Sequence, residues 1–530
     1  MRGREGNALL TAALRDAALV AAPLLTAALL FACAHGAPAP GDPDLRTQAS
    51  PPLLASGPPA AQVALPAPGH PTVAVRLHFA AGSVDDPPGK EGLTALTAAV
   101  MAEGGAGTLS SGEVARALYP MAAELEVVLD KETTVFAARC PEADVERLTA
   151  LLADVVLRPR FDPGAFERLR SRALDAVSKG LRSADDEELA KEALSGMLFA
   201  GHPYGHPTQG TVVGLRSIAL DDVKAHWRRV FVRARLTVGA AGGYAGDLPG
   251  RIAGALASLP LGAARGPLPV PGAVGPRFLL VEKASAPTAI SMGFRWEVKR
   301  GHPDFPALVA AVSALGEHRQ GSAFRLFHQL RELRGLTYGA YAYPEHFVQG
   351  PGSALPAPNH ARTFQAFTVW VRPVEPQQRI FALRAALHEV GRWARDGLDE
   401  EELGRVKRFL AGYTLAFDQT DARRLGSALD DLFYGLDRPW LPTLRERIAA
   451  LTLADVNGAI RRHVDPARLR VAIATHGAEA MAAEMRSGAP SPITYPSPKP
   501  PELTEADRLI ARLPLEGEVK VVKVSELFER

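Results

Sequence analysis

The chain of 530 residues contains only two cysteines, Cys33 and Cys140. Two cysteines exclude a fold held by several disulfides and a cysteine-rich zinc module, so a metal ion would need histidine and carboxylate ligands. An excess of charge is missing too, because 60 Lys and Arg stand against 58 Asp and Glu. Without a basic field we expect no nucleic-acid partner. With 47% hydrophobic residues, the chain is long enough to fold into two to four domains.

The N-terminus lacks an apolar run long enough to span a membrane. Three arginines precede an apolar stretch of 16 residues at 17–32, whereas a membrane-spanning helix needs about 20. This pattern predicts a signal peptide over residues 1–32. The stretch ends Leu30-Phe31-Ala32-Cys33, which resembles a bacterial lipobox and implies lipidation of Cys33. We therefore expect a lipoprotein of the cell envelope, anchored at the periplasmic side with the outer membrane favoured; an ordinary secretory signal is the alternative.

Composition divides the rest of the chain. Residues 33–71 are rich in Pro, Ala and Gly, which predicts a semi-extended tether without a core. A second Gly- and Pro-rich stretch, 261–276, predicts a linker between an N-terminal domain at 72–260 and a C-terminal domain at 277–486. Residues 487–530 form a C-terminal tail. Its segment 519–528 could add an edge strand to the sheet, but the sequence does not decide whether it does.

The two domains carry a long-range repeat. Residues 218–242 align without a gap to residues 451–475, at a constant offset of 233, with ten identical positions. A period of this length is too long for a solenoid and indicates a duplicated domain. Chance similarity between two amphipathic helices is the alternative, but the match continues beyond the helix into an apolar strand.

The hydrophobic periodicity predicts an α+β fold, in which helices pack on a mostly antiparallel sheet in each half. The predicted first-half elements are strand 72–80, helices 91–103 and 111–119, strands 123–129 and 132–140, helices 142–157, 163–181, 186–199 and 219–231, and strand 234–241. A strand at 287–298 opens the second half in the same way as 72–80 opens the first.

Three segments resemble a known enzyme family. Residues 89–93 (GKEGL) before a helix, residues 199–207 (FAGHPYGHP) and residues 330–338 (LRELRGLTY) are similar, in that order, to blocks of the pitrilysin/insulinase (processing-peptidase-like) metallopeptidases. The resemblance covers about residues 72–480. It implies two duplicated domains that close like a clam around a peptide or an unfolded polypeptide.

The sequence departs from this family at the zinc motif. Active members carry H-x-x-E-H, in which two histidines bind zinc and the glutamate activates water. Alignment on Gly92-Leu93 places the histidines at Ala95 and Ala99 and the glutamate at Ala98, and the family's third ligand falls at Ala176. Alanine can neither coordinate zinc nor accept a proton. We therefore expect that this chain binds no metal cofactor and does not hydrolyse peptides alone.

No other histidine pattern replaces the missing site. His202 and His206 have the i, i+4 spacing of a zinc pair, but Pro203 and Gly205 between them argue against a helix. A structural turn is the favoured interpretation. His318, His328 and His346 are scattered without a metal-ligand spacing.

One functional element of the family is kept. Arg331 and Tyr338 match an arginine and a tyrosine, seven residues apart, that contact the substrate carbonyl in the family. The resemblance implies a heterodimer in which a zinc-bearing homologue supplies zinc and this chain supplies carbonyl support. Two alternatives stay open: an architectural protein, and a peptide-binding clam without hydrolysis. A partnered, buried Arg–Tyr pair is the structural alternative for the two residues.

Overall fold

The computed structural model describes residues 60–284, 287–318, 321, 323–349, 353 and 355–530. The predicted signal peptide, Cys33 and residues 33–59 of the predicted tether lie outside the described residues. Within the described ranges, none of the helices combines the length and the apolar composition needed to cross a membrane.

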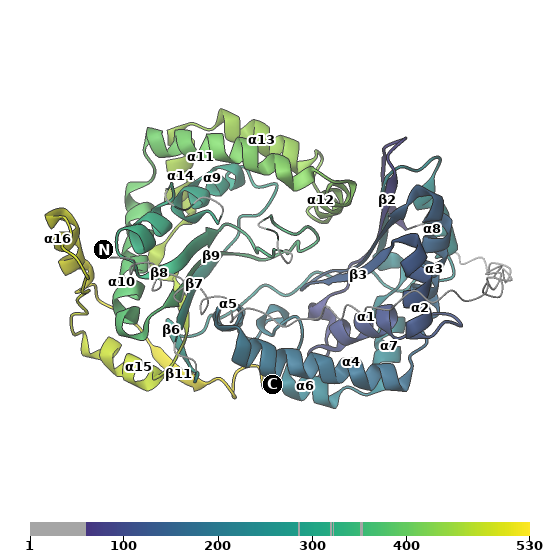
Figure 1. The fold of residues 1–530 in the computed structure, drawn as a ribbon, viewed down its shortest axis with the longest axis horizontal. Helices are drawn as coiled ribbons and strands as arrows, with labels where there is room; N and C mark the ends of the chain where they lie inside the picture. The colour runs from purple at the N-terminus through teal and green to yellow at the C-terminus, as the bar shows by residue number, and fades with distance from the viewer. Residues whose placement is uncertain (1–59, 285–286, 319–320, 322, 350–352, 354) are drawn as a thin grey trace, which may run out of the picture. The chain divides into compact units, whose positions relative to one another are not determined.

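The first half is built on a five-stranded sheet (Figure 1). Its strand order is β1-β5-β2-β4-β3, and all neighbours are antiparallel except β1 and β5. The bounds are β1 (Ala61–Pro66), β2 (Thr72–Phe79), β3 (Glu124–Leu129), β4 (Thr134–Pro141) and β5 (Leu236–Gly242). Side chains of helices α1 (Leu93–Glu103), α3 (Val145–Leu157) and α8 (Leu248–Ala255) join those of the strands in one core.

Strand β1 corrects the predicted boundary of the tether. The range 33–71 was expected to lack regular structure, yet Ala61–Pro66 pairs in parallel with β5. Between Pro59 and Pro66 the chain has no proline, so its amide groups are free to join the ladder. Val63 and Leu65 also pack against Ala241 and Leu425. The folded body therefore begins before residue 72.

The second half repeats this topology. Its sheet has the order β11-β6-β10-β7-β9-β8, in which β6, β10, β7, β9 and β8 correspond to β1, β5, β2, β4 and β3. The bounds are β6 (Phe278–Glu282), β7 (Thr288–Trp296), β8 (Thr337–Tyr343), β9 (Gln365–Val374), β10 (Arg470–Thr475) and β11 (Val519–Lys523). Helices α7 (Leu220–Val230) and α14 (Leu453–His463) keep the offset of 233 residues. The duplication predicted from the sequence is thus also a duplication of topology.

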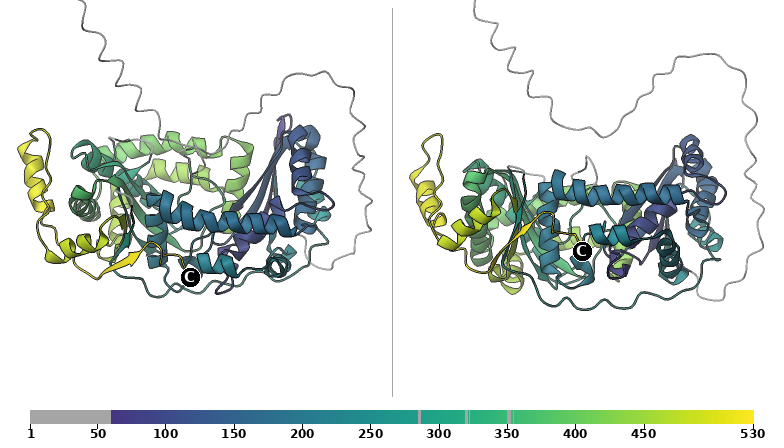
Figure 2. Two further views of the ribbon diagram at one scale, coloured as in Figure 1. Left: turned by 60° about the horizontal axis from the view of Figure 1, so that its bottom comes forward. Right: turned by 90° about the horizontal axis from the view of Figure 1, so that it is seen from below.

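Strand β11 answers the question that the tail sequence left open. It adds a sixth strand at the edge of the second sheet, parallel to β6 (Figure 2). Strand β6 itself was not predicted from the sequence. Its five residues follow directly on the linker, which has no regular structure at 261–276, as expected.

The remaining helices complete the two halves. They are α2 (Ser111–Leu118), α4 (Pro163–Asp175), α6 (Val212–Ser217), α9 (Phe305–Gly316), α10 (Arg379–Asp396), α11 (Glu400–Tyr413), α13 (Trp440–Ala450), α15 (Ala478–Ser487) and α16 (Pro501–Ile510). The predicted helix 163–181 is divided into α4 and a π-helical segment, Ala176–Ala184. The predicted helix at 142–157 starts with a 3₁₀ turn and becomes α-helical at Val145.

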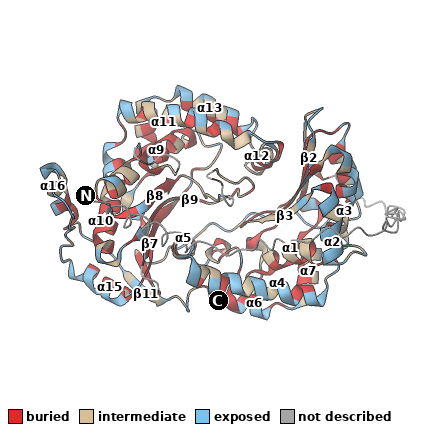
Figure 3. Cartoon of the chain, in the orientation of Figure 1, coloured by how far each residue is buried: buried red, intermediate tan, exposed pale blue. Residues whose placement is uncertain are grey.

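Each half also lends one helix to the other. Helix α5 (Asp186–Leu198) of the first half packs on β7 and β10 of the second sheet, where Leu189 and Ala193 share a core with Ala289 and Ala472. Helix α12 (Asp421–Phe433) of the second half packs on β2 and β5. The inward faces of the helices and the central strands are buried (Figure 3). This exchange joins the two halves through shared apolar cores.

A buried polar contact joins the halves as well. The β3–β4 turn, residues 130–133, is at most 2% exposed. Arg362 of the second half donates from Nε to Asp130 Oδ2 at 2.7 Å and from Nη2 to Asp130 Oδ1 at 2.6 Å. Burial alone would raise the pKa of Asp130, but the charge and hydrogen bonds of Arg362 outweigh it and hold the pKa well below its usual range. The carboxylate is therefore ionised in the folded protein.

We predict that Asp130→Asn lowers the free energy of unfolding by about 3–5 kcal/mol at neutral pH, because it leaves the Arg362 charge buried without its partner. Urea denaturation measures the change. Glu446→Gln is the control, since it breaks an exposed pair with Arg438 and should cost less than about 1 kcal/mol. The difference from wild type should shrink as the pH falls below about 4, where the stabilisation by a carboxylate of depressed pKa is lost. Equal costs for the two variants would contradict the role given to this pair.

Candidate functional site

Helix α1 carries Ala95, Ala98 and Ala99, three of the four positions to which the sequence alignment assigns the zinc site. The helix starts after Gly92, which has φ +104°. A Cβ atom on Gly92 would lie 2.8 Å from the carbonyl oxygen of Gln209, so the close approach of these segments requires glycine. Ala95 and Ala99 are half-buried, whereas Ala98 is fully buried in the first-half core.

An exposed ion pair connects α1 and α4. Arg172 of α4 donates from Nη1 to Glu103 Oε2 of α1 at 2.8 Å. Ala99 lies one turn before Glu103, and Ala176 lies one turn after Arg172, so helical periodicity places these alanines beside the ion pair on facing helices. The assignment of zinc-site positions to Ala99 and Ala176 stays a prediction from the sequence.

The side chains at this place do not fit a zinc ion. Methyl groups offer no lone pair, and zinc in proteins takes three or four N, O or S ligands. Asp175, next to Ala176, pairs with Lys179 Nζ at 2.9 Å and is one carboxylate only. In the described residues, metal-compatible groups of three His, Cys, Asp or Glu side chains occur at two other places.

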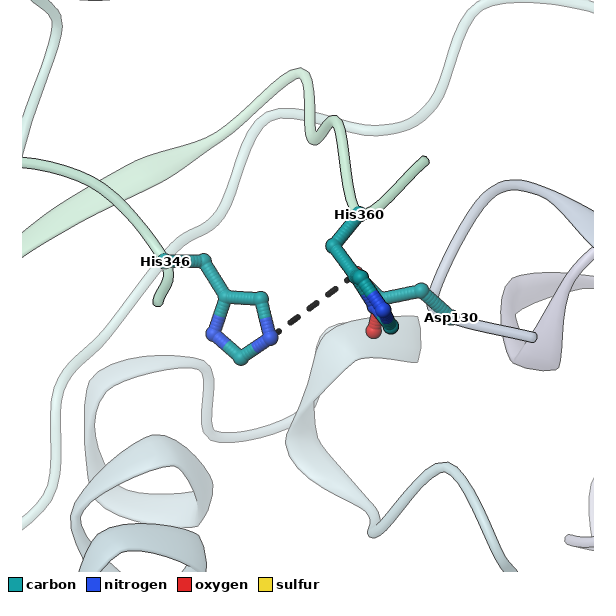
Figure 4. Close-up of side chains that lie close together, drawn as sticks. All are labelled: Asp130, His346 and His360. Carbon is teal, nitrogen blue, oxygen red and sulfur yellow. Dashed lines mark ion pairs between the residues drawn. The ribbon is translucent and has the colours of Figure 1, made fainter. Parts of the chain in front are cut away.

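The first such group contains Asp130, His346 and His360 (Figure 4). His346 Nε2 and His360 Nδ1 lie 3.9 and 4.0 Å from Asp130 Oδ2. Arg362 already places a cation there, since its Nη2 is 2.8 Å from His346 Nε2. Burial lowers the pKa of both histidines, so they stay neutral. This group belongs to the polar contact between the halves and does not favour a metal ion.

The second group contains His302, Asp304 and His463. Arg462 binds both carboxylate oxygens of Asp304, at 2.8 and 2.9 Å, and His463 Nε2 lies 2.7 Å from Asp304 Oδ2. The amide of Asp304 donates to His302 Nδ1 at 3.1 Å, which leaves the proton of a neutral ring on Nε2. The group thus ties the start of α9 to the end of α14, and its one carboxylate, Asp304, is already bound by Arg462 and His463.

His202 and His206 lie in a turn, as the sequence indicated. Residues Pro203–Gly205 form a short 3₁₀ segment. The amide of Tyr204 donates to His202 Nδ1 at 3.1 Å, and His202 Nε2 lies 2.9 Å from the carbonyl oxygen of Pro269. These contacts give His202 a structural role.

Arg331 and Tyr338 are brought together by a turn between a helix and a strand. Arg331 lies in the π-helical segment Phe327–Glu332, and Tyr338 is the second residue of β8. The Arg331 guanidinium lies 4.4 Å from the centre of the Tyr338 ring and 4.7 Å from that of Phe327. The Tyr338 side chain is 64% exposed. Within the described ranges, no carboxylate forms an ion pair with Arg331, so the buried, partnered alternative does not describe this pair.

A cavity of about 570 Å³ lies between residues of the two halves. Its walls include Glu187 and Lys191 of α5 and His318, Arg362 and Trp370 of the second half. Lys191 Nζ lies 3.6 Å from the centre of the Trp370 ring and 2.7 Å from Glu187 Oε1. The cavity lining includes neither the four alanines nor the Arg331–Tyr338 pair. Sequence reasoning missed this cavity, because its two walls come from segments more than a hundred residues apart that carry no shared motif.

Two family models match this chain. The sequence model for the insulinase family (peptidase family M16) matches residues 62–212, and the model for the peptidase M16 inactive domain matches residues 217–410. The chain belongs to the M16 peptidase family.

Curated M16 relatives and solved structures cover most of the chain. An uncharacterized zinc protease of Mycobacterium tuberculosis is 28% identical over 381 residues, which are 70% of this chain and 81% of the relative. The non-peptidase homologue YmxG of Helicobacter pylori is 25% identical over 414 residues, 76% of this chain and 88% of the relative. The crystal structure of a peptidase M16 inactive domain from Pseudomonas fluorescens has a TM-score of 0.70 at 24% identity, and covers 79% of this chain and 96% of that one. These likenesses confirm the clam-like M16 fold of two duplicated domains.

We predict that the M16 zinc site can be rebuilt on α1 and α4. The triple variant Ala95→His, Ala99→His and Ala176→Glu should bind about one zinc ion per chain, because it restores three protein ligands while leaving the buried Ala98 unchanged. Equilibrium dialysis with metal analysis measures the stoichiometry. The control variant Ala95→His, Ala102→His and Ala176→Glu has the same composition, but its histidines are two turns apart and should not chelate. If both variants bind zinc equally, the alignment of the alanines is wrong.

Proposed function

We propose that this chain is the zinc-less subunit of a two-chain M16 peptidase, and that it pairs with a zinc-bearing homologue. The observation that carries the proposal is a contrast between the two halves. The first half has alanine at every zinc-site position, whereas the second half keeps Arg331 and Tyr338 together and Tyr338 largely exposed. A chain that had lost all contact with substrate would have no use for such a pair.

The chemistry of the pair suits a peptide carbonyl. A guanidinium donates hydrogen bonds to a carbonyl oxygen, and a phenol can donate to the negative charge that develops on that oxygen during hydrolysis. The aromatic rings on either side of Arg331 restrict the orientation of its guanidinium. In this proposal the partner supplies the metal centre, and this chain orients the scissile carbonyl.

The substrate of the proposed complex is a peptide or an unfolded polypeptide. A cavity between the two halves, separate from the Arg331–Tyr338 pair, has carboxylates, cations and a tryptophan in its walls. Such a mixed lining can contact both backbone and side chains of an extended peptide.

We predict that Arg331→Ala and Tyr338→Phe each reduce kcat/KM of the co-purified pair at least about tenfold, or 1.4 kcal/mol of transition-state stabilisation. The assay is cleavage of an unstructured peptide by this chain together with a zinc-motif homologue encoded beside it. Arg116→Ala and Tyr119→Phe are the matched controls, since both residues are exposed and belong to the first half, outside the Arg331–Tyr338 motif.

The outcomes separate the competing functions. A pair that forms but cleaves equally well with all four variants would make this chain an architectural subunit. Failure to retain any zinc-bearing homologue, together with tight peptide binding, would instead support a solitary peptide-binding protein. Either result would remove the proposed function.

A further inference from the structure

The C-terminal segment, residues 488–530, is held tightly although it lies beyond the residues that match the family models. After α15 the chain passes through a Pro-rich stretch, forms α16, and then adds β11 to the second sheet (Figures 1 and 2). Ile510, Ala511 and Leu515 are buried in the second-half core. The segment is therefore part of the folded body rather than a loose tail.

A buried arginine of the body depends on this segment for its hydrogen bonds. Arg384 of α10 is 1% exposed. Its Nη1 donates to the carbonyl oxygens of Ala489 and Ala511 at 3.0 and 2.7 Å, and its Nε donates to that of Leu513 at 2.9 Å. Within the described ranges no carboxylate pairs with Arg384. A buried guanidinium without these acceptors would be costly, so the segment has to stay in place.

A second buried arginine connects the segment to the functional motif. Arg334 lies in the turn between Arg331 and Tyr338 and is 5% exposed. Its Nε donates to Asp507 Oδ1 of α16 at 2.8 Å, and the hydroxyl of Tyr495 donates to Asp507 Oδ2 at 2.6 Å. Lys499 Nζ donates to the carbonyl oxygen of Leu333, the preceding residue of the turn, at 2.8 Å. Two consecutive turn residues are thus bound by the C-terminal segment.

Hydrogen bonds within residues 328–336 also shape the turn between Arg331 and Tyr338. Gly335 has φ +64°, and its amide donates to the carbonyl oxygen of Arg331 at 2.8 Å. The amide of Leu336 donates to the carbonyl oxygen of Leu330 at 2.9 Å. Residues 333–334 are held from the helical side as well, because the amide of Leu333 donates to the carbonyl oxygen of His328 at 3.0 Å and Arg334 Nη1 donates to the carbonyl oxygen and Oε1 of Gln329 at 2.9 and 2.8 Å. The contacts with Lys499 and Asp507 add the C-terminal segment to this set.

The far end of the segment reaches the first half. Arg182 Nε donates to the carbonyl oxygen of Leu527 at 2.7 Å, and Arg182 Nη2 donates to Glu529 Oε2 at 2.9 Å. The amide of Val212 donates to the carbonyl oxygen of Phe528 at 3.0 Å. Arg182 belongs to the π-helical segment that begins at Ala176. One C-terminal segment therefore contacts the Arg331–Tyr338 turn and the element that carries a degenerate zinc position.

We propose that the C-terminal segment is a positioning strap for the Arg331–Tyr338 pair, with Asp507 as its positioning residue. Asp507 acts through Arg334 and does not touch substrate. The catalytic consequence rests on the proposed function, but the effect on the turn can be measured in the isolated chain.

The test compares Asp507→Asn with Glu505→Gln, which lies on the same helix and breaks only an exposed pair with Arg508. Hydrogen exchange of the amides at 333–336 in the full isolated chain is the first readout. Asp507→Asn should speed this exchange about tenfold while the second-sheet strands keep their protection, and Glu505→Gln should leave it unchanged. Tyr495→Phe, which removes one hydrogen bond and keeps the ion pair, should give a smaller effect in the same direction.

The second readout is kcat in the two-chain cleavage assay, which Asp507→Asn should lower with little change in KM because the carbonyl support is misplaced. Unchanged exchange at 333–336 in both Asp507→Asn and Tyr495→Phe would overturn the strap, and so would a uniform rise over the whole chain. Faster local exchange in a protein whose wild type supports no cleavage with any zinc-bearing homologue would remove the proposed function and leave the positioning strap standing.

Discussion

A buried ion pair between Asp130 and Arg362, which are 232 residues apart, fixes the contact between the two halves of this protein. Ions removed from water persist only where their partners and remaining hydrogen bonds are all in place. A second buried carboxylate of the same turn is also bound across the halves, since the amide of Thr363 donates to Glu132 Oε1 at 2.6 Å. The exchanged helices α5 and α12 bury apolar area between the halves. The ion pair adds two directional hydrogen bonds to this contact. Both residues of the pair also line the cavity between the halves.

The two halves differ in which residues of the family's motifs they contain. On α1 alanine preserves the helix, since it has the highest helix propensity, while it removes every ligand atom. The M16 fold therefore does not depend on its metal site. In the second half, the buried Arg334 binds Asp507 of the C-terminal strap. This contact holds the turn that brings Arg331 onto the ring of Tyr338.

Much of the fold was predictable from local patterns and from the repeat. The alternation in Thr72–Phe79 and the aligned helices α7 and α14 fix strands, helices and the duplication, because these signals are periodic and lie within one segment. Strand β1 was hidden by the prolines on both sides, and β6 by its position next to the linker. The pairs Asp130–Arg362 and Arg334–Asp507 join residues 232 and 173 positions apart. Such a pair leaves no mark on either local sequence, so neither the cavity nor the strap could be predicted.

The most direct test of the central claim is the metal content and the unaided activity of the purified chain. The first-half alanines predict that the native protein, isolated as a single chain, carries far less than one tightly bound zinc ion per chain and does not cleave an unstructured peptide. Metal analysis after dialysis, followed by a cleavage assay with and without a chelator, measures both quantities on one sample. Stoichiometric zinc together with hydrolysis that stops on chelation would contradict this account of the M16 chain.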